Sequence, residues 1–316
     1  MQPQVIGVDI AKAHLVTVTL GQHPHCKIIG NEAVGITAWL DTLPAGSVVA
    51  METTGKYHRL LAQLAHAAGM RVFVLNARDV HFYAKALSSR AKTDRLDAEV
   101  IARYVAEHSE ILHEWQPPRD IEQQLQDLLR RRAEVTRLVV SLRQSLADVP
   151  SLQKAGQEVY AAFDCFFEDL DQQLVTLVER DEALRQGVAR LRTITGIGPQ
   201  SSILLAALFN RVAFANADSL VAYVGLDPRP CDSGIRQGKR RLSKRGAAVL
   251  RRQLYLVAFA ASHSKALKST YQAIKAKGFA PTQALIILAR KLLRTAFAVW
   301  KSGKPFDLAR FAPNPN

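Results

Sequence analysis

The sequence has few cysteines and no long apolar run, and each shortage excludes a class of protein. The three cysteines, Cys26, Cys165 and Cys231, are far apart and lack CxxC spacing, which excludes a disulfide framework and a cysteine-bound zinc site. The best candidate for a membrane span, residues 284–289, is cut short by Arg290, so we expect no membrane association. The chain begins with neither a basic segment nor an apolar signal core, and we therefore expect a cytoplasmic protein.

Acidic residues are scarce in one part of the chain only. The 316 residues contain 48% hydrophobic and 22% charged residues, which is typical of a globular protein, and their net charge is +14. Residues 191–316 contain 21 Lys and Arg against 4 Asp and Glu, a net charge of +17, whereas the preceding 190 residues have a net charge of −3. A surface that only aids solubility would not need this asymmetry. The basic segment predicts binding to a polyanion such as nucleic acid.

The first third of the sequence alternates strands and helices. Apolar runs predict strands at 5–10, 14–20, 26–30, 47–51 and 71–75, and helical spacing predicts helices at 36–43 and 57–68, with another near 92–105. Three strands followed by helix, strand, helix, strand and helix is the element order of the ribonuclease-H-like fold. We therefore predict an α/β domain over residues 1–115.

The middle of the sequence has a heptad rhythm. Apolar residues recur at spacings of three and four over 121–149 and 163–191, with Arg132 and Asp181 as exceptions and a break near Pro150. This predicts either a long antiparallel helical hairpin or an oligomerising coiled coil over residues 116–190.

The remaining segment, 191–316, is predicted to be helical and basic. The turn at 196–199, GIGP, resembles that of a helix-hairpin-helix motif, in which glycines let the backbone approach a phosphate, although such a turn is equally typical of a simple helix cap. We expect Ser243 to cap the next helix and Pro281 to start a final helix ending near Gly303. The predicted nucleic-acid-binding residues are Gly196, Gly198, Arg236, Lys239, Arg240, Arg241, Lys244, Arg245, Arg251 and Arg252.

Four acidic residues in the first third form a candidate metal site. Asp9 and Glu52 each lie at the end of a predicted strand, while Asp94 and Asp97 are three apart on a predicted helix and share one face. Carboxylates and water are the ligands that Mg²⁺ prefers. Two such ions held close together can activate an attacking oxygen and stabilise the leaving oxygen in phosphodiester cleavage.

Each acid alone also has a structural interpretation. Asp9 could cap a strand end and Glu52 could be solvated beside a turn, whereas Asp94 and Asp97 could cap the helix or favour its dipole. Their joint placement on two strands and one helix favours the metal site. Glu99 and Asp79 lie off the shared face or in a connection, and we interpret them as structural.

Six motifs in order give the chain a resemblance to a known family. The sequence resembles the DEDD transposases of bacterial insertion sequences, which include the Piv-type DNA invertases and the bridge-RNA-guided recombinases. The motifs are GVDIAK at 7–12, METTGKY at 51–57, KTDRLDA at 92–98, TITGIG at 193–198, VGLDPRPCDSG at 224–234 and LSKRGAAVLRRQLY at 242–255. The resemblance implies a RuvC-like N-terminal domain, a coiled-coil insertion and a C-terminal transposase domain.

The resemblance also implies a catalytic apparatus. It places the four metal-binding acids at Asp9, Glu52, Asp94 and Asp97, with Mg²⁺, two ions per site, as cofactor, which Mn²⁺ could replace. It implies that Ser233 is a nucleophile that forms a covalent phosphoserine link. From the residues alone, Ser233 would be a turn residue, and Cys231 is a rival nucleophile that the family motif does not favour.

Partners follow from the same resemblance. It implies that the protein binds donor and target DNA and a structured guide RNA from the element, and that it associates with the nucleoid during action. It also implies a homo-oligomer, either a dimer or a tetramer, in which the acids of one protomer can meet the serine of another. Two alternatives remain open: a junction-resolving endonuclease that uses the acids and water with Ser233 inert, and a catalytically inactive nucleic-acid-binding protein. A protein–DNA adduct that survives denaturation distinguishes the recombinase from the endonuclease.

Overall fold

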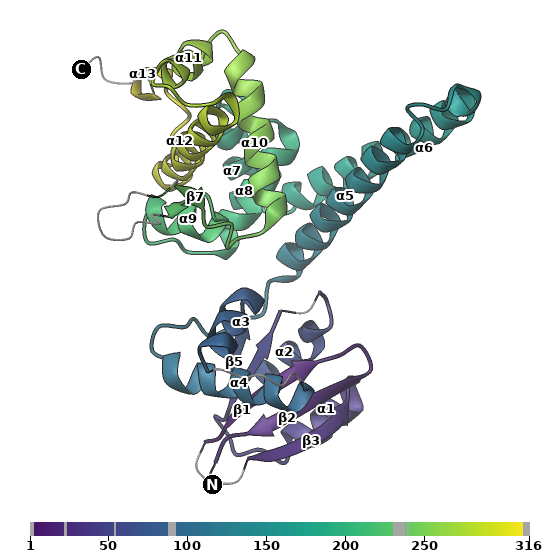
Figure 1. Ribbon diagram of the computed structural model, residues 1–316, viewed down its shortest axis with the longest axis vertical. Helices are drawn as coiled ribbons and strands as arrows, with labels where there is room; N and C mark the ends of the chain where they lie inside the picture. Colours follow the sequence, from purple (N-terminus) through teal and green to yellow (C-terminus); the bar gives the residue numbers. More distant parts are fainter. Residues whose placement is uncertain are drawn as a thin grey trace. The chain divides into compact units, whose positions relative to one another are not determined.

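The computed structural model describes residues 3–21, 24–53, 55–87, 93–229, 238 and 240–311. The chain divides into two compact units, Met1–Pro117 and Pro118–Asn316, and Figure 1 shows both. The first unit contains a mixed five-stranded sheet with helices, and the second is almost entirely helical.

The sheet of the first unit has the strand order β3-β2-β1-β4-β5. Its antiparallel half is a meander, and its parallel half pairs β1 with β4 and β4 with β5. The strands are β1 (Val5–Ile10), β2 (His14–Thr19), β3 (His25–Gly30), β4 (Val48–Glu52) and β5 (Arg71–Leu75). Neighbouring parallel strands end at the same edge of a sheet, so the residues after β1 and β4 lie beside each other.

Two separate apolar clusters cover the two faces of this sheet. Because side chains alternate along a strand, Ile6 and Val8 of β1 face one side, where they pack with α1 (Ala33–Leu40) and α2 (His58–Ala67). Val48 and Ala50 of β4 face the other side and pack with α3 (Ala77–Ala86) and α4 (Asp94–His108). The layers are therefore helices, sheet and helices (Figure 1).

The predicted strands and the predicted helices α1, α2 and α4 occur in the expected order, but the structure adds helix α3, where no helix was predicted, so Asp79 lies in a helix and not in a connection. The observed order is three strands, helix, strand, helix, strand and helix, followed by α4. The first helix begins at Ala33, three residues before its predicted start.

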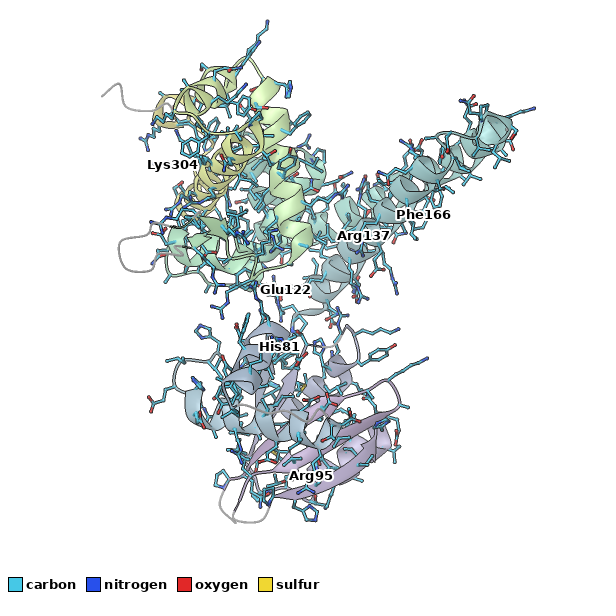
Figure 2. The ribbon with its side chains drawn as sticks, viewed as in Figure 1. His81, Arg95, Glu122, Arg137, Phe166 and Lys304 are labelled. Carbon is cyan, nitrogen blue, oxygen red and sulfur yellow. The ribbon has the colours of Figure 1, made fainter. Side chains whose placement is uncertain are left out.

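The second unit begins with two long helices, α5 (Asp120–Ser145) and α6 (Gln153–Glu179), joined through a short 3₁₀ turn. They run antiparallel, because Arg132 pairs with Asp171 while Arg143, eleven residues further along α5, lies over the ring of Tyr160 in α6. Figure 2 labels Phe166 and Arg137 on this pair. The antiparallel arrangement agrees with the helical-hairpin alternative, but the hairpin ends at Glu179, and the predicted second stretch, 163–191, is divided between α6 and a separate helix over 182–192.

Only the base of this helical pair joins the main core of the unit. Leu125, Leu170 and Leu174 are buried there, whereas Leu138 and Phe166, further along the pair, are exposed. Glu122 is also buried at the base, where Asn210 donates to its carboxylate at 2.9 Å. The pair is therefore anchored at one end.

The rest of the second unit is one helical body around a shared apolar core. Its helices are α7 (Glu182–Arg192), α8 (Pro199–Arg211), α9 (Ala217–Val224), α10 (Ala248–His263), α11 (Lys268–Ala276), α12 (Pro281–Ser302) and α13 (Leu308–Phe311). The predicted helix from Pro281 to Gly303 is confirmed as α12, although the one-turn helix α13 follows it. Within the described ranges, no helix combines the length and apolarity that a membrane span requires.

The predicted role of Ser243 as a helix cap is wrong. Helix α10 begins at Ala248, and Ser243 is buried five residues earlier, where its hydroxyl donates to the carboxylate of Asp227. The backbone N–H of Ser243 donates to the carbonyl oxygen of Asp227 at 3.0 Å. Ser243 therefore stabilises the loop before the helix and does not cap the helix, because its hydroxyl and its backbone N–H both donate to Asp227.

Candidate functional site

Asp9 and Glu52 lie at the same edge of the sheet. In the parallel pair β1–β4, Val8 is aligned with Met51, so the next aligned positions are Asp9 and Glu52. Both acids end or nearly end their strands, which places their carboxylates where the chain leaves the sheet. Adjacent strands therefore contribute one acid each.

The two acids also point to the same face. Ala50 packs in the cluster beneath α4, and Glu52, two residues later, has the same orientation. Gly7 lies directly against α4, and Asp9 follows it by two residues. Both carboxylates therefore lie on the face that α4 covers.

Helix α4 presents the other two acids in its first turn. Thr93 is the N-cap, and its hydroxyl oxygen accepts from the backbone N–H of Leu96 at 3.3 Å. Asp94 and Asp97 follow directly, and their spacing of three places them on one side of the helix. Acidic groups in a first turn are stabilised by the N–H groups that the helix leaves unbonded.

Close contact between the helix and the sheet fixes the register of α4. A Cβ on Gly7 would lie 2.0 Å from the carbonyl oxygen of Ala98 and 2.5 Å from the backbone nitrogen of Ala102, so only glycine admits the helix at this distance. Ala98 is one turn after Asp94, and because the charges of Asp94 and Asp97 act on Asp9, the first turn of α4 lies beside the end of β1 that carries Asp9. The helix thereby brings its acids to the strand acid.

The pKa of Asp9 shows that its carboxyl interacts with the carboxylates of Asp94 and Asp97. Burial raises the pKa of the Asp9 carboxyl above its ordinary value, and the carboxylates of Asp94 and Asp97 raise it further. The backbone of Ile10 and the charge of His14 act in the opposite direction. A bound cation would favour the ionised form of all three acids, because opposite charge lowers the pKa of a carboxyl.

The donor chemistry of this site fits a hard divalent cation, because every donor is a carboxylate oxygen. In the ranges that the structure describes, however, no three side chains of His, Cys, Asp or Glu gather closely enough to hold a metal ion. The structure brings Asp9, Asp94 and Asp97 into electrostatic contact and places Glu52 on the same face of the next strand. A metal would have to draw these side chains together.

Ser233 lies outside the described residues, as do Cys231, Arg236 and Lys239. The chain on either side of this segment is held by a two-stranded ribbon, in which β6 (Pro228–Arg229) pairs with β7 (Arg241–Leu242).

The base of this ribbon is built from close backbone contacts. Gly225 ends α9 in the left-handed region with φ 75°, and a Cβ there would lie 2.6 Å from the backbone nitrogen of Arg245. The guanidinium of Arg251 donates to the carbonyl oxygens of Val224 and Gly246. Arg251 therefore has a structural role in addition to its predicted role in binding.

The other predicted basic residues lie around this ribbon and on α10. Exposed basic residues in and around β7 are Arg240, Arg241, Lys244 and Arg245, and Arg252 is exposed in the first turns of α10. Lys244 has φ 53°, a left-handed conformation that is uncommon outside glycine.

The two glycines of the 196–199 turn have different surroundings. Gly196 has φ 94° and contacts α10, since a Cβ there would lie 2.6 Å from the carbonyl oxygen of Val257. Gly198 is the N-cap of α8, and the position of its missing Cβ is open. Gly196 is thus required for packing inside the fold, while Gly198 leaves room beside the helix N-terminus.

Comparison with known proteins decides the family. A family model described as "Transposase", the DEDD transposase of IS110, matches residues 6–149, and a model described as "Transposase IS116/IS110/IS902 family" matches residues 188–272. The chain is 30% identical over 320 residues to the "Pilin gene-inverting protein" of Moraxella bovis, covering 97% of this chain and 98% of that one. The chain belongs to the IS110 family of transposases.

Two further relatives agree with this assignment. The "Pilin gene-inverting protein" of Moraxella lacunata is also 30% identical over 320 residues, with 97% of this chain and 98% of the relative covered. The "Insertion element IS900 uncharacterized 42 kDa protein" of Mycobacterium paratuberculosis is 26% identical over 385 residues, with 94% and 96% covered. The resemblance predicted from the motifs is confirmed: the protein is a DNA transposase or recombinase, and its substrate is DNA.

The structure of this transposase adds one residue that the sequence analysis missed. The side-chain amide of Asn31 donates to the carbonyl oxygen of Ala11 at 2.9 Å and to that of Tyr57 at 3.4 Å. Asn31 therefore links the loop after the Asp9 strand to the turn after the Glu52 strand. Its sequence context, between a strand and a helix, is typical of an ordinary turn, and no local signal indicates these two distant acceptors.

Proposed function

We propose that this transposase cuts and rejoins DNA through an active site with two halves. Asp9, Glu52, Asp94 and Asp97 form one half and hold divalent metal, two Mg²⁺ ions per site, for which Mn²⁺ can substitute. Ser233 forms the other half as the nucleophile. The observation that supports the first half is the electrostatic contact of Asp9 with Asp94 and Asp97 on one face of the sheet.

The four acids have a defined task in this scheme. They keep several negative charges together in a partly buried place, which is unfavourable without a cation and therefore favours metal binding. When bound, the metal would lower the pKa of an attacking hydroxyl and stabilise the charge of a leaving oxygen. The backbone contact at Gly7 keeps the first turn of α4 beside Asp9 while this happens.

In this scheme Ser233 replaces one DNA phosphodiester bond by a phosphoserine ester, so that the energy of the broken bond is kept for rejoining. Its hydroxyl oxygen attacks a phosphorus atom and releases its proton to water as the oxygen–phosphorus bond forms. The bond to the leaving deoxyribose oxygen breaks, and that oxygen takes up a proton from water. The product is a phosphoserine ester. A deoxyribose hydroxyl of another strand then attacks the same phosphorus, which restores the serine and completes the exchange without an external energy source.

The fold and partners belong to the same proposal. The first unit is a RuvC-like domain over residues 1–115, and the second consists of a coiled-coil hairpin formed by α5 and α6 and a transposase domain that includes α7 and residues 191–316. The net charge of +17 in the last segment supports contacts with DNA and with a structured guide RNA from the element. Dimers or tetramers assemble on cellular DNA and bring the acids of one protomer to the serine of another.

A denaturation-resistant adduct tests this proposal. Wild-type protein incubated with Mg²⁺ and labelled donor DNA should give a DNA-linked band on a denaturing gel, and Ser233→Ala should abolish that band and strand transfer while DNA binding persists. Cys231→Ala is the matched control in the same segment and should retain the adduct. If Ser233→Ala still cleaves DNA and no adduct forms in the wild type, the enzyme is instead an endonuclease that uses water.

A second measurement tests the guide. Protein purified from cells that contain the complete insertion element should carry a discrete RNA from the non-coding end of the element. Recovery of only fragmented cellular RNA, with unchanged recombination after ribonuclease treatment, would contradict this part.

A further inference from the structure

Helices α5, α8 and α10 of the second unit enclose a groove of about 310 Å³. Its walls come from the middle of α5, the first turns of α8 and the first turns of α10. Of the described residues that line it, three are arginines and none is acidic. We call this the α10 groove.

Two of the three arginines are not neutralised by an acidic side chain among the described residues. Arg132 is engaged, because its guanidinium donates to both carboxylate oxygens of Asp171 at 2.6 and 3.0 Å. Arg137 on α5 and Arg252 on α10 are exposed, and neither has an ion-pair partner within the described part of the chain. Figure 2 labels Arg137 where α5 passes the helical body. Two unpaired cations on opposite walls of a groove attract an anion, since their charges are not spent within the protein.

The floor of the groove is apolar. Leu129, Leu204 and Leu256 line it, and a second hollow of about 270 Å³ shares Leu129 and Leu204 and continues along α8. One turn beyond Leu256 on α10, Phe259 is 49% exposed. The surface therefore combines cations with an apolar strip and an exposed ring, a combination that suits the faces of unpaired bases and their phosphates.

The N-terminus of α8 borders the groove beside the carboxylate of Asp171, to which the side chain of Gln200 donates at 3.1 Å. Gln200, the second residue of this helix, lines the groove, and the N-cap Gly198 leaves the space beside it open. Backbone N–H groups at the start of a helix favour a phosphate. Because Asp171 already occupies the side chains of Gln200 and Arg132, the attraction for a phosphate depends on Arg137 and Arg252.

We propose that the α10 groove binds an unpaired single strand of DNA, with Arg137 and Arg252 on its phosphates and the apolar floor against its sugars or bases. This inference rests on DNA being the substrate and is independent of the carboxylate site and of Ser233. Strand exchange exposes unpaired strands, and a duplex would keep its base faces stacked inside, away from Leu256. The absence of acidic lining residues among those described disfavours a basic peptide as the occupant.

Binding measurements in EDTA test the groove without any catalysis. The full chain is titrated into a labelled 20-nucleotide oligothymidine at several salt concentrations, and the double variant Arg137→Gln/Arg252→Gln is compared with wild type. Removing two phosphate contacts should reduce the slope of log K against log salt by about 1.4 and weaken binding by about tenfold at 0.1 M salt. Leu256→Gln should weaken binding with the slope unchanged, because an apolar contact releases no counterions.

A matched control separates the groove from general charge. Lys268→Gln/Lys277→Gln removes the same charge from exposed positions of the α11 region of the same unit and should leave both the slope and the affinity close to wild type. Equal weakening by both double variants would overturn the proposal, because it would show that binding depends on the overall positive charge of the unit and not on the groove.

Other probes identify other occupants. If a 20-base-pair duplex loses as much affinity as the single strand, the groove binds duplex backbone, and if only oligouridine RNA is affected, the strand is RNA; either result overturns the assignment. Unchanged affinity for every nucleic acid would also overturn the assignment. Thermal unfolding of each variant must match wild type. Because these assays contain no metal, a failed Ser233 adduct leaves their outcome unaffected.

Discussion

Asp9 is the residue whose environment most clearly separates function from stability. Its carboxyl is half-buried and close to two other acids, so ionisation costs the folded protein energy that a neutral side chain would not cost. A cluster of acids that lowers stability is retained where the acids bind a ligand, because selection for stability alone would replace them.

Asp9→Asn should therefore stabilise the first unit when metal is removed with EDTA. The folded-state pKa of Asp9 is raised, so the wild-type chain loses stability as pH rises from the ordinary value of 3.8 through the raised pKa. The melting temperature of the variant should exceed that of the wild type at pH 7, and the difference should vanish as pH falls toward 3.8. Thermal unfolding across this pH range measures the effect.

The control for this comparison is Glu110→Gln, which removes one negative charge from an exposed position in the same unit. It should give no comparable pH-dependent gain. A variant Asp9→Asn that is less stable than wild type at pH 7 in EDTA would show that the carboxylate is structurally required.

At the scale of elements, the antiparallel pair α5–α6 depends on a polar contact inside an otherwise apolar rhythm. Arg132 interrupts the apolar spacing of α5, yet its side chain is only 18% exposed and reaches Asp171 in α6 while lying over the ring of Phe167. Gln200 of α8 donates to the same carboxylate at 3.1 Å. The residue that breaks the pattern is thus one that joins three helices.

A double-mutant cycle measures this joint. Arg132→Ala and Asp171→Ala, singly and together, should give a coupling of about 1 kcal/mol in urea unfolding, because the pair is bidentate and partly buried. The exposed pair Arg131–Glu134 on α5 has one contact at 3.0 Å and should couple by less than about 0.5 kcal/mol. Equal couplings would mean that the interhelical geometry adds nothing.

Helices and strands could be predicted from the sequence where the spacing of nearby residues determines them. The strand and helix order of the first third follows from periodicity, and the shared face of Asp94 and Asp97 follows from helical spacing. The contact of Gly7 with Ala98 and the links of Asn31 could not be predicted, because they join residues far apart in sequence. Ser243 misled because serine before a basic apolar run is typical of a helix cap, whereas a distant carboxylate, that of Asp227, binds its hydroxyl.

At the scale of the whole chain, the two units have separate interiors. Among the described residues, the apolar clusters around the sheet extend as far as Trp115, and the large helical cluster begins at Ile121. The acids therefore belong to one folding unit, and the segment with Ser233 belongs to the other.

Calorimetry of the full chain should resolve this division as two transitions. Gly7→Ala overpacks α4 against the sheet and should destabilise the first unit by about 1–3 kcal/mol. Gly187→Ala should act on the second unit, because a Cβ there would lie 2.1 Å from the ring of Trp300. Each variant should lower one transition only, and Gly21→Ala, whose added Cβ meets nothing within 4 Å, should lower neither. A single transition that both variants shift would show that the units unfold together.

The backbone contact at Gly7 also has a genetic consequence. Every missense change of a glycine codon adds a Cβ, and at this position any Cβ collides with the backbone of α4. A mobile element copied many times in a genome accumulates such changes at random. Copies that have lost this glycine should therefore be immobile even when their four acidic codons are intact, and codon 7 should separate active copies from inactive ones in a genome survey.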